Sequence, residues 1–225
     1  DWSSDVCSSD LVTRGKDAFI LQQINDNVFK HPFKIADNIE RINIYLKQHS
    51  PNYLFVSPLR SLANMELVHL ENDGYFRLFP FIEGSHTISV VSSPEQAYEA
   101  AFQFGKFTRL LSGFDAGSLN TTIPDFHNLS LRYTQYENAL RNGNPSRIKK
   151  AKQLVNDLKA YTSILTVFEK VQMDPRIKKR VMHHDTKISN VLFNDLERGI
   201  AVIDLDTVMP GYFISDVGDM MRTYL

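Results

Sequence analysis

The stretch V-M-H-H-D-T-K-I-S-N-V-L-F spans residues 181–193, and A-V-I-D-L-D follows it at residues 201–206. The polar segment D-L-E-R-G between them contains a glycine and indicates the turn of a hairpin. Its two strands would cover residues 190–194 and 200–205. The first stretch has the spacing H-x-D-x-K-x-x-N, formed by His183, Asp185, Lys187 and Asn190, and Asp204 lies fourteen residues beyond Asn190.

These residue types in this order suit phosphoryl transfer from ATP. That reaction needs a carboxylate to orient the attacking hydroxyl, a cation near the developing charge, and oxygen ligands for Mg²⁺. We expect Asp185 to be the catalytic base and Lys187 the cation. Asn190 and Asp204 would bind Mg²⁺, and His183 would anchor the loop backbone. The spacing is that of kinase catalytic loops, so we predict an enzyme that phosphorylates a small molecule.

The bulk composition excludes several other classes of protein. The chain has 225 residues, of which 43% are hydrophobic and 23% charged, as in ordinary globular proteins. A net charge of −1 gives no reason to expect a nucleic acid or an anionic membrane as partner. No apolar run approaches the roughly 18–20 residues that a membrane-spanning helix needs.

The two ends of the chain look foreign or incomplete. Residues 1–11 repeat Ser-Ser-Asp and hold the only Trp and the only Cys, and they resemble a translated sequencing adapter. We expect them to be extraneous. The remainder has no cysteine, which fits a reducing, cytoplasmic setting. The last residues, D-M-M-R-T-Y-L, continue a helical pattern without a stop signal, so we expect a fragment truncated at both ends.

Residues 12–82 are expected to form a partial N-terminal lobe built on an antiparallel sheet. Residues 18–24 are predicted to be a strand, and residues 33–49 an amphipathic helix with isoleucines at helical spacing. Residues 62–70 and 75–82 are predicted to be two strands joined by the turn E-N-D-G.

Residues 83–225 are expected to form a mainly helical C-terminal lobe that carries the catalytic loop. Ser93 followed by Pro94 predicts a helix over residues 93–111, with Ala97 and Ala101 among its buried positions. Further helices are predicted at residues 131–141 and 147–171. The predicted fold class is therefore α+β, with two lobes.

The motifs H-H-D-T-K-I-S-N, V-I-D-L-D-T-V-M-P-G and D-V-G-D-M-M-R resemble those of the aminoglycoside phosphotransferase superfamily, which has a protein-kinase-like fold. The segments L-Q-Q-I-N-D-N-V-F-K, R-L-F-P-F-I-E-G and I-P-D-F-H-N are similar to stretches of its N-acetylhexosamine 1-kinase group. The resemblance covers nearly all of residues 12–225. It implies transfer of the ATP γ-phosphate to the C1 hydroxyl of an N-acetylhexosamine.

The resemblance also implies a nucleotide site and shows where this chain departs from the usual pattern. Phe79, Phe81 and Ile82 match the connection between the lobes, whose backbone meets adenine. Gln22 stands where kinases usually place a phosphate-binding lysine, and it brings no charge. Glu40 matches, by position, the acid that would brace the nucleotide-binding lobe; equally, it would suit an exposed glutamate on a helix. No glycine-rich phosphate loop precedes residue 18.

The acceptor site is indicated only by a loop that precedes a helix. Phe126 would stack on a sugar ring, and His127 and Arg132 would bind its hydroxyls; equally, all three would suit a loop anchor and a solvated surface. A kinase of an aminoglycoside, choline or another amino alcohol is a second reading, although the loop offers only Asp115 and Asp125 to a cation. A third reading is a catalytically incomplete nucleotide-binding fragment.

Overall fold

The computed structural model describes residues 7–225, and the first six residues of the predicted leader lie outside the described residues. The chain divides into two compact units. The first contains the described residues up to Ile123 together with Lys179–Leu225, and the second is Pro124–Lys178. Within the described part, no helix is both long and apolar enough to cross a lipid bilayer.

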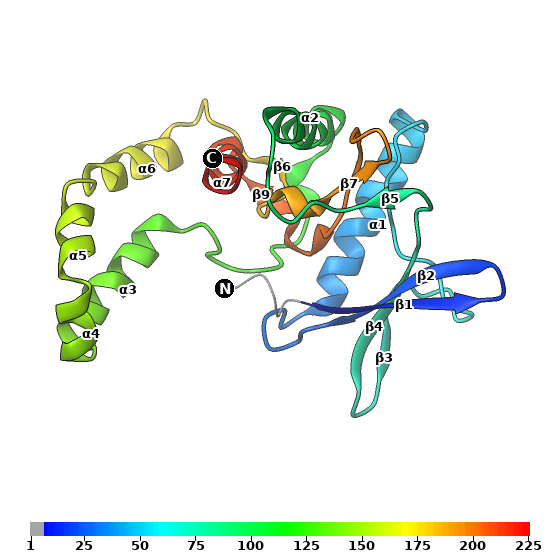
Figure 1. The fold of residues 1–225 in the computed structure, drawn as a ribbon, viewed down its shortest axis with the longest axis horizontal. Helices are drawn as coiled ribbons and strands as arrows, with labels where there is room; N and C mark the ends of the chain where they lie inside the picture. The colour runs from blue at the N-terminus through cyan, green and yellow to red at the C-terminus, as the bar shows by residue number, and fades with distance from the viewer. Residues whose placement is uncertain (1–6) are drawn as a thin grey trace. The chain divides into compact units, whose positions relative to one another are not determined.

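The first unit contains an antiparallel four-stranded sheet in the order β1-β2-β4-β3, visible in Figure 1. The predicted strand at residues 18–24 is confirmed as β2, and the predicted hairpin as β3 and β4, although β3 is shorter than expected. Asn72 and Gly74 in the connecting turn have φ of +72° and +97°, which Asn and Gly tolerate best. The strands are β1 (Cys7–Arg14), β2 (Asp17–Ile24), β3 (Val68–Leu70) and β4 (Gly74–Pro80).

Helix α1 (Pro32–His49) confirms the predicted amphipathic helix. Its buried stripe consists of Ile35, Ile39, Ile42 and Leu46, each almost fully excluded from solvent. Asn38 on the same face is also buried, and its amide donates to the carbonyl oxygens of Asn120 and Val208 at 2.8 and 3.0 Å. The bond to Val208 joins α1 to the segment that follows Asp204.

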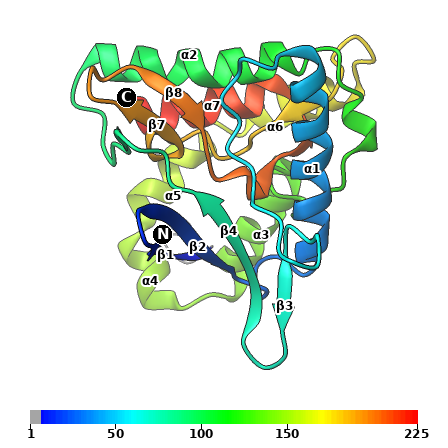
Figure 2. The ribbon, with the colours of Figure 1, turned by 90° about the vertical axis from the view of Figure 1, so that its right-hand side faces the viewer.

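Helix α2 (Pro94–Leu110) begins where Ser93 and Pro94 predicted, and the Ser93 hydroxyl accepts a hydrogen bond from the Gln96 N–H at 3.3 Å. Its buried face differs by a small rotation from the predicted one. Ala100, Phe104 and Phe107 are buried, whereas Ala97 and Ala101 are half-buried. The helix packs against strand β8 (Gly199–Val202), which belongs to the hairpin that follows Asn190. Figure 2 shows α2 above this strand.

Two small sheets frame the catalytic segment. The predicted hairpin is confirmed as β7 and β8, paired in antiparallel register with Val191 opposite Val202. The sheets have the orders β5-β7-β8 and β6-β9. The elements are β5 (Ser85–His86), η1 (Ala116–Ser118), β6 (Arg180–Met182), η2 (Ile188–Asn190), β7 (Val191–Asn194), β8 (Gly199–Val202), η3 (Leu205–Thr207), β9 (Met209–Gly211) and α7 (Phe213–Tyr224).

The second unit consists of helices only. The predicted helix at residues 131–141 is confirmed, but the single helix expected over residues 147–171 is three shorter ones. None of the helical residues here is buried, so no packing against a core selects one continuous helix over several short ones. The helices are α3 (Leu129–Asn142), α4 (Pro145–Lys150), α5 (Lys152–Lys159) and α6 (Ser163–Met173).

Candidate active site

Asp185 lies on the loop between β6 and β7 and is surrounded by the polar residues that the motif predicted. The Asn190 amide donates to the Asp185 carbonyl at 2.8 Å and to carboxylate Oδ2 at 3.0 Å. The Lys187 ammonium contacts the same Oδ2 at 2.9 Å. Among the described residues, none donates a hydrogen bond to Oδ1 of Asp185, so this oxygen is available to accept a bond from a substrate hydroxyl.

His183 holds the loop in place, as predicted. The Asp185 N–H donates to His183 Nδ1 at 3.3 Å, so Nδ1 is unprotonated and Nε2 carries the ring proton. Nε2 then donates to the Ile203 carbonyl at 2.9 Å. Because the ring is fully buried and both nitrogens face the backbone, His183 has a structural role and does not touch the reacting groups.

Asn190 and Asp204 are brought together by the backbone of the hairpin. The Ile203 N–H donates to the Asn190 carbonyl at 2.9 Å, so the residue before Asp204 pairs directly with Asn190. Asp204 has a left-handed backbone, with φ of +58°, a conformation that Asp adopts more readily than most residues. Burial raises the pKa of Asp204 to about 7, and the neighbouring Asp206 and Asp185 act in the same direction while Lys187 opposes them.

The loop is also bound from the side by α7. Asp216 accepts hydrogen bonds from the backbone N–H groups of His183 and His184, both at 2.9 Å. Asp219 accepts from the Thr186 N–H at 2.7 Å, and the Tyr224 hydroxyl donates to the Thr186 carbonyl at 2.8 Å. Asp216 and Asp219 therefore hold the backbone of the loop in place.

Gly211 is expected to be intolerant of any side chain. A Cβ at this position would lie 2.2 Å from the His184 ring, which is buried, and 3.2 Å from Met182. We expect Gly211→Ala to lower the free energy of unfolding by about 1–3 kcal/mol, because the ring and the loop must move. Urea denaturation measures this. Gly218→Ala is the control, since a Cβ on Gly218 meets nothing within 4 Å, and equal losses in the two variants would contradict the prediction.

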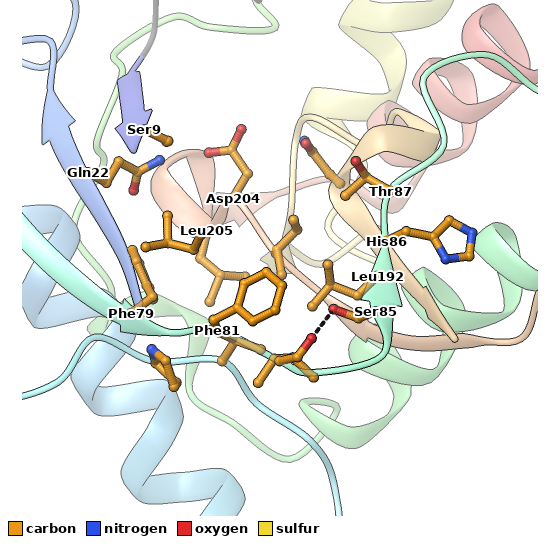
Figure 3. A pocket seen from close by; sticks show the side chains of 16 residues that line it. Ser9, Gln22, Phe79, Phe81, Ser85, His86, Thr87, Leu192, Asp204 and Leu205 are labelled. Carbon is orange, nitrogen blue, oxygen red and sulfur yellow. Dashed lines mark hydrogen bonds between the residues drawn. The ribbon is translucent and has the colours of Figure 1, made fainter. Parts of the chain in front are cut away.

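A cavity of about 520 Å³ opens between the four-stranded sheet and the catalytic hairpin. It brings together the predicted nucleotide residues, Gln22, Phe79, Phe81 and Ile82, with both predicted metal ligands. Figure 3 shows the Gln22 amide and the Asp204 carboxylate projecting into it from opposite sides. Its wall is formed by Ser9, Ile20, Gln22, Val56, Phe79, Pro80, Phe81, Ile82, Ser85, His86, Thr87, Asn190, Leu192, Ile203, Asp204 and Leu205.

Three features of this site were not expected from the sequence. Glu40 does not brace the sheet, because its carboxylate pairs with the exposed Arg60. Ser9 lies in the cavity wall although it belongs to the predicted leader, of which residues 7–11 pair with β2. Arg77 is buried directly behind the cavity wall and pairs with Asp206. The sequence contained an indication of this pair, because Arg77 is the one charged residue in the apolar stretch Y-F-R-L-F. A charge buried in such a strand requires a partner.

The predicted acceptor residues all belong to the second unit. Phe126 and His127 lie in the segment before α3, with ring centroids 4.6 Å apart. Arg132 on α3 donates to Gln135 at 3.0 Å. Their part in an acceptor site stays a prediction.

Comparison with solved structures identifies the same fold. An aminoglycoside phosphotransferase from Alicyclobacillus acidocaldarius superposes with a TM-score of 0.66 at 13% identity, over 95% of this chain and 64% of that one. Amicoumacin kinase bound to AMP-PNP and Ca²⁺ gives 0.61 at 14% identity, over 98% and 62%. Spectinomycin phosphotransferase bound to AMP gives 0.59 at 17% identity, over 90% and 63%. The predicted α+β, protein-kinase-like two-lobe fold is confirmed.

These similarities differ in what they cover. Residues 11–225 match the phosphotransferase enzyme family, known as APH, which is nearly the whole chain. The chain in turn spans less than two thirds of the length of the three solved structures.

Proposed function

This chain belongs to the phosphotransferase enzyme family, and from that premise we propose that it transfers the γ-phosphate of ATP to a hydroxyl group of a small molecule. The acceptor that we propose is the C1 hydroxyl of an N-acetylhexosamine, acted on in the cytoplasm. The observation that supports this proposal is the cavity described above. Gln22 and the Phe79–Ile82 connection line it on one side, and Asn190 and Asp204 line it on the other. A nucleotide and a divalent cation would meet there, next to Asp185.

In this mechanism Asp185 orients the acceptor. Its Oδ2 is held by Asn190 and Lys187, so the carboxylate is fixed in direction while Oδ1 accepts the hydrogen bond of the attacking hydroxyl. The hydroxyl proton passes to Asp185 as the acceptor oxygen bonds to the γ-phosphorus, while the bond from that phosphorus to the β,γ-bridging oxygen breaks and ADP leaves. Lys187, 2.9 Å from that carboxylate, would offset the negative charge of a phosphoryl group transferred next to Asp185.

The residues present fit a divalent cation. Burial raises the pKa of Asp204, which shows a carboxylate that lacks sufficient positive charge nearby. The Asn190 amide donates its N–H groups to Asp185, so its carbonyl oxygen is directed elsewhere and can act as a ligand. One carboxylate from Asp204 and one amide oxygen from Asn190, completed by phosphate oxygens, make a set of ligands that suits Mg²⁺. When bound, Mg²⁺ would neutralise phosphate charge.

The charges of the loop that contains Asp115 and Asp125 and, separately, the charges beside Asp185 favour a neutral acceptor over a cationic one. The two carboxylates that the loop offers already have local partners: Asp115 accepts from the Gly117 N–H at 3.0 Å, and Asp125 from the Asn128 amide at 2.9 Å. Lys187 adds a positive charge beside Asp185. An amino alcohol or aminoglycoside would need carboxylates that are not engaged in this way.

The proposal is tested by measuring ADP release with Mg·ATP and a panel of acceptors. We expect turnover with N-acetylglucosamine or N-acetylgalactosamine, and none with choline or an aminoglycoside. The product should be a sugar 1-phosphate, identifiable by ³¹P NMR. Turnover with a cationic acceptor alone would assign the chain to the alternative class of amino-alcohol or aminoglycoside kinase. Nucleotide binding without turnover of any acceptor would favour the catalytically incomplete fragment.

A further inference from the structure

Gln22 in the cavity wall and Arg77 behind that wall are direct cross-strand partners. The register of β2 and β4 places them opposite each other, on the same face of the sheet. Arg77 Nε and one terminal nitrogen donate to Gln22 Oε1 at 2.8 and 2.6 Å. The guanidinium carbon also lies 5.0 Å from the centre of the Phe79 ring, and both Gln22 and Phe79 line the cavity.

This contact fixes which way the Gln22 amide faces. A guanidinium has only donors, so the atom of Gln22 that meets it must be the carbonyl oxygen. The NH₂ group is then turned away from Arg77, and Figure 3 shows it directed toward the Asp204 side of the cavity. Gln22 thus presents a hydrogen-bond donor to the space where phosphates would lie, although it carries no charge itself.

Arg77 also reaches the segment that carries Asp204. Its guanidinium donates to the carboxylate of Asp206, which lies in η3 two residues after Asp204 and is fully buried. Removing either partner of a buried ion pair leaves an uncompensated charge, so this contact ties the sheet firmly to the Asp204 segment. One side chain therefore contacts both walls of the cavity.

We propose that Arg77 is a positioning residue for nucleotide phosphates: it directs the Gln22 NH₂ group into the cavity and holds Asp206 so that Asp204 faces the same phosphates. This inference rests on the proposed function. It assigns the orientation of the neutral Gln22 donor to an arginine behind the wall, whose own charge is paired with Asp206. The ligand class is the polyphosphate of a nucleoside di- or triphosphate.

Gln22→Glu separates this role from simple stabilisation of the sheet. Glutamate keeps the oxygen that accepts from Arg77, but it replaces the NH₂ donor with a second, negatively charged oxygen. We expect the variant to fold as stably as the wild type and to bind Mg·ADP at least about tenfold more weakly in a calorimetric titration, because a hydrogen bond to a charged phosphate is lost and replaced by repulsion. The matched control is Gln23→Glu, on the opposite, exposed face, where affinity should not change.

A second comparison tests the coupling through Arg77. In Arg77→Lys the ammonium group keeps a positive charge for Asp206. It lacks the several N–H groups of the guanidinium that also bind Gln22. We expect it to raise KM for ATP by about tenfold, with kcat nearly unchanged, and to have little further effect in a Gln22→Ala background. A purely structural arginine would have equal effects in both backgrounds.

The outcomes distinguish the inference from the function on which it rests. Wild-type protein that binds no Mg·ADP would overturn both. Wild-type binding with an unchanged affinity in Gln22→Glu would overturn the inference alone, as would equal effects of Arg77→Lys in the two backgrounds. Gln22→Glu retains both Arg77 and Asp206, so the inference stays testable if Arg77→Lys fails to fold.

Discussion

Asp185→Asn is expected to reduce the rate of phosphate transfer by a factor of about 10²–10⁴, the usual contribution of a positioned general base. The amide keeps the shape of the carboxylate and can still accept a hydrogen bond from Asn190 or Lys187, so the loop should keep its structure. It cannot take the proton of the acceptor hydroxyl. We therefore expect kcat to fall while the affinity for Mg·ADP stays near that of the wild type.

The control for this variant is Asp195→Asn, the same change at an exposed aspartate in the β7–β8 turn. It should leave kcat, nucleotide affinity and melting temperature unchanged. Single-turnover kinetics with the best acceptor of the panel would make the comparison. If Asp185→Asn retained turnover within about threefold of the wild type, Asp185 would not be the base.

Asp204→Asn is expected to abolish activity and yet to stabilise the metal-free protein at alkaline pH. Burial, followed by repulsion from Asp206, raises the pKa of Asp204 to about 7 in the folded protein, against an ordinary value near 4. Between these values the folded chain keeps a proton that the unfolded chain has lost. The free energy of unfolding therefore falls as pH rises from about 4 to 7, by an amount on the order of 2–4 kcal/mol.

Asparagine does not ionise, so the free energy of unfolding of the variant should not fall over this pH range. Denaturation curves of both proteins at pH 5 and pH 8 in the presence of EDTA measure this pH dependence. With Mg²⁺ and ADP at pH 8, the melting temperature of the wild type should rise, whereas that of Asp204→Asn should respond far less because it has lost a charged ligand. The same pH dependence in both proteins would show that Asp204 is not the group responsible.

The sequence predicted the catalytic loop and the hairpin well because both are local. Asp185, Lys187 and Asn190 lie within six residues, and two short apolar strands with a glycine-containing turn bring Asp204 back to them. Strand β2, helix α1 and the start of α2 were equally well marked. Apolar patterns indicated the strand and α1, and a Ser-Pro helix start indicated α2. The approach of Asp204 to the motif therefore follows from features that a single segment contains.

Long-range contacts could not be predicted in the same way. Nothing within residues 75–80 indicates that Arg77 would meet Asp206, which is 129 positions away and reaches it only through packing of the sheet on the hairpin. The partner of Glu40 could not be predicted for the same reason, because its position on α1 did not reveal that Arg60 lies beside it. The break of the predicted long helix into α4, α5 and α6 reflects the absence of burial, which an apolar stripe alone does not reveal.

The three side chains with which α7 secures residues 183–186 have a practical implication for protein engineering. Asp216, Asp219 and Tyr224 supply four of the bonds that give this loop its shape, and none of them belongs to the catalytic motif. A designer who transplants the eight-residue motif onto another scaffold must therefore carry this helix with it. Random mutagenesis should likewise recover inactive clones altered along one side of α7, with their catalytic side chains intact.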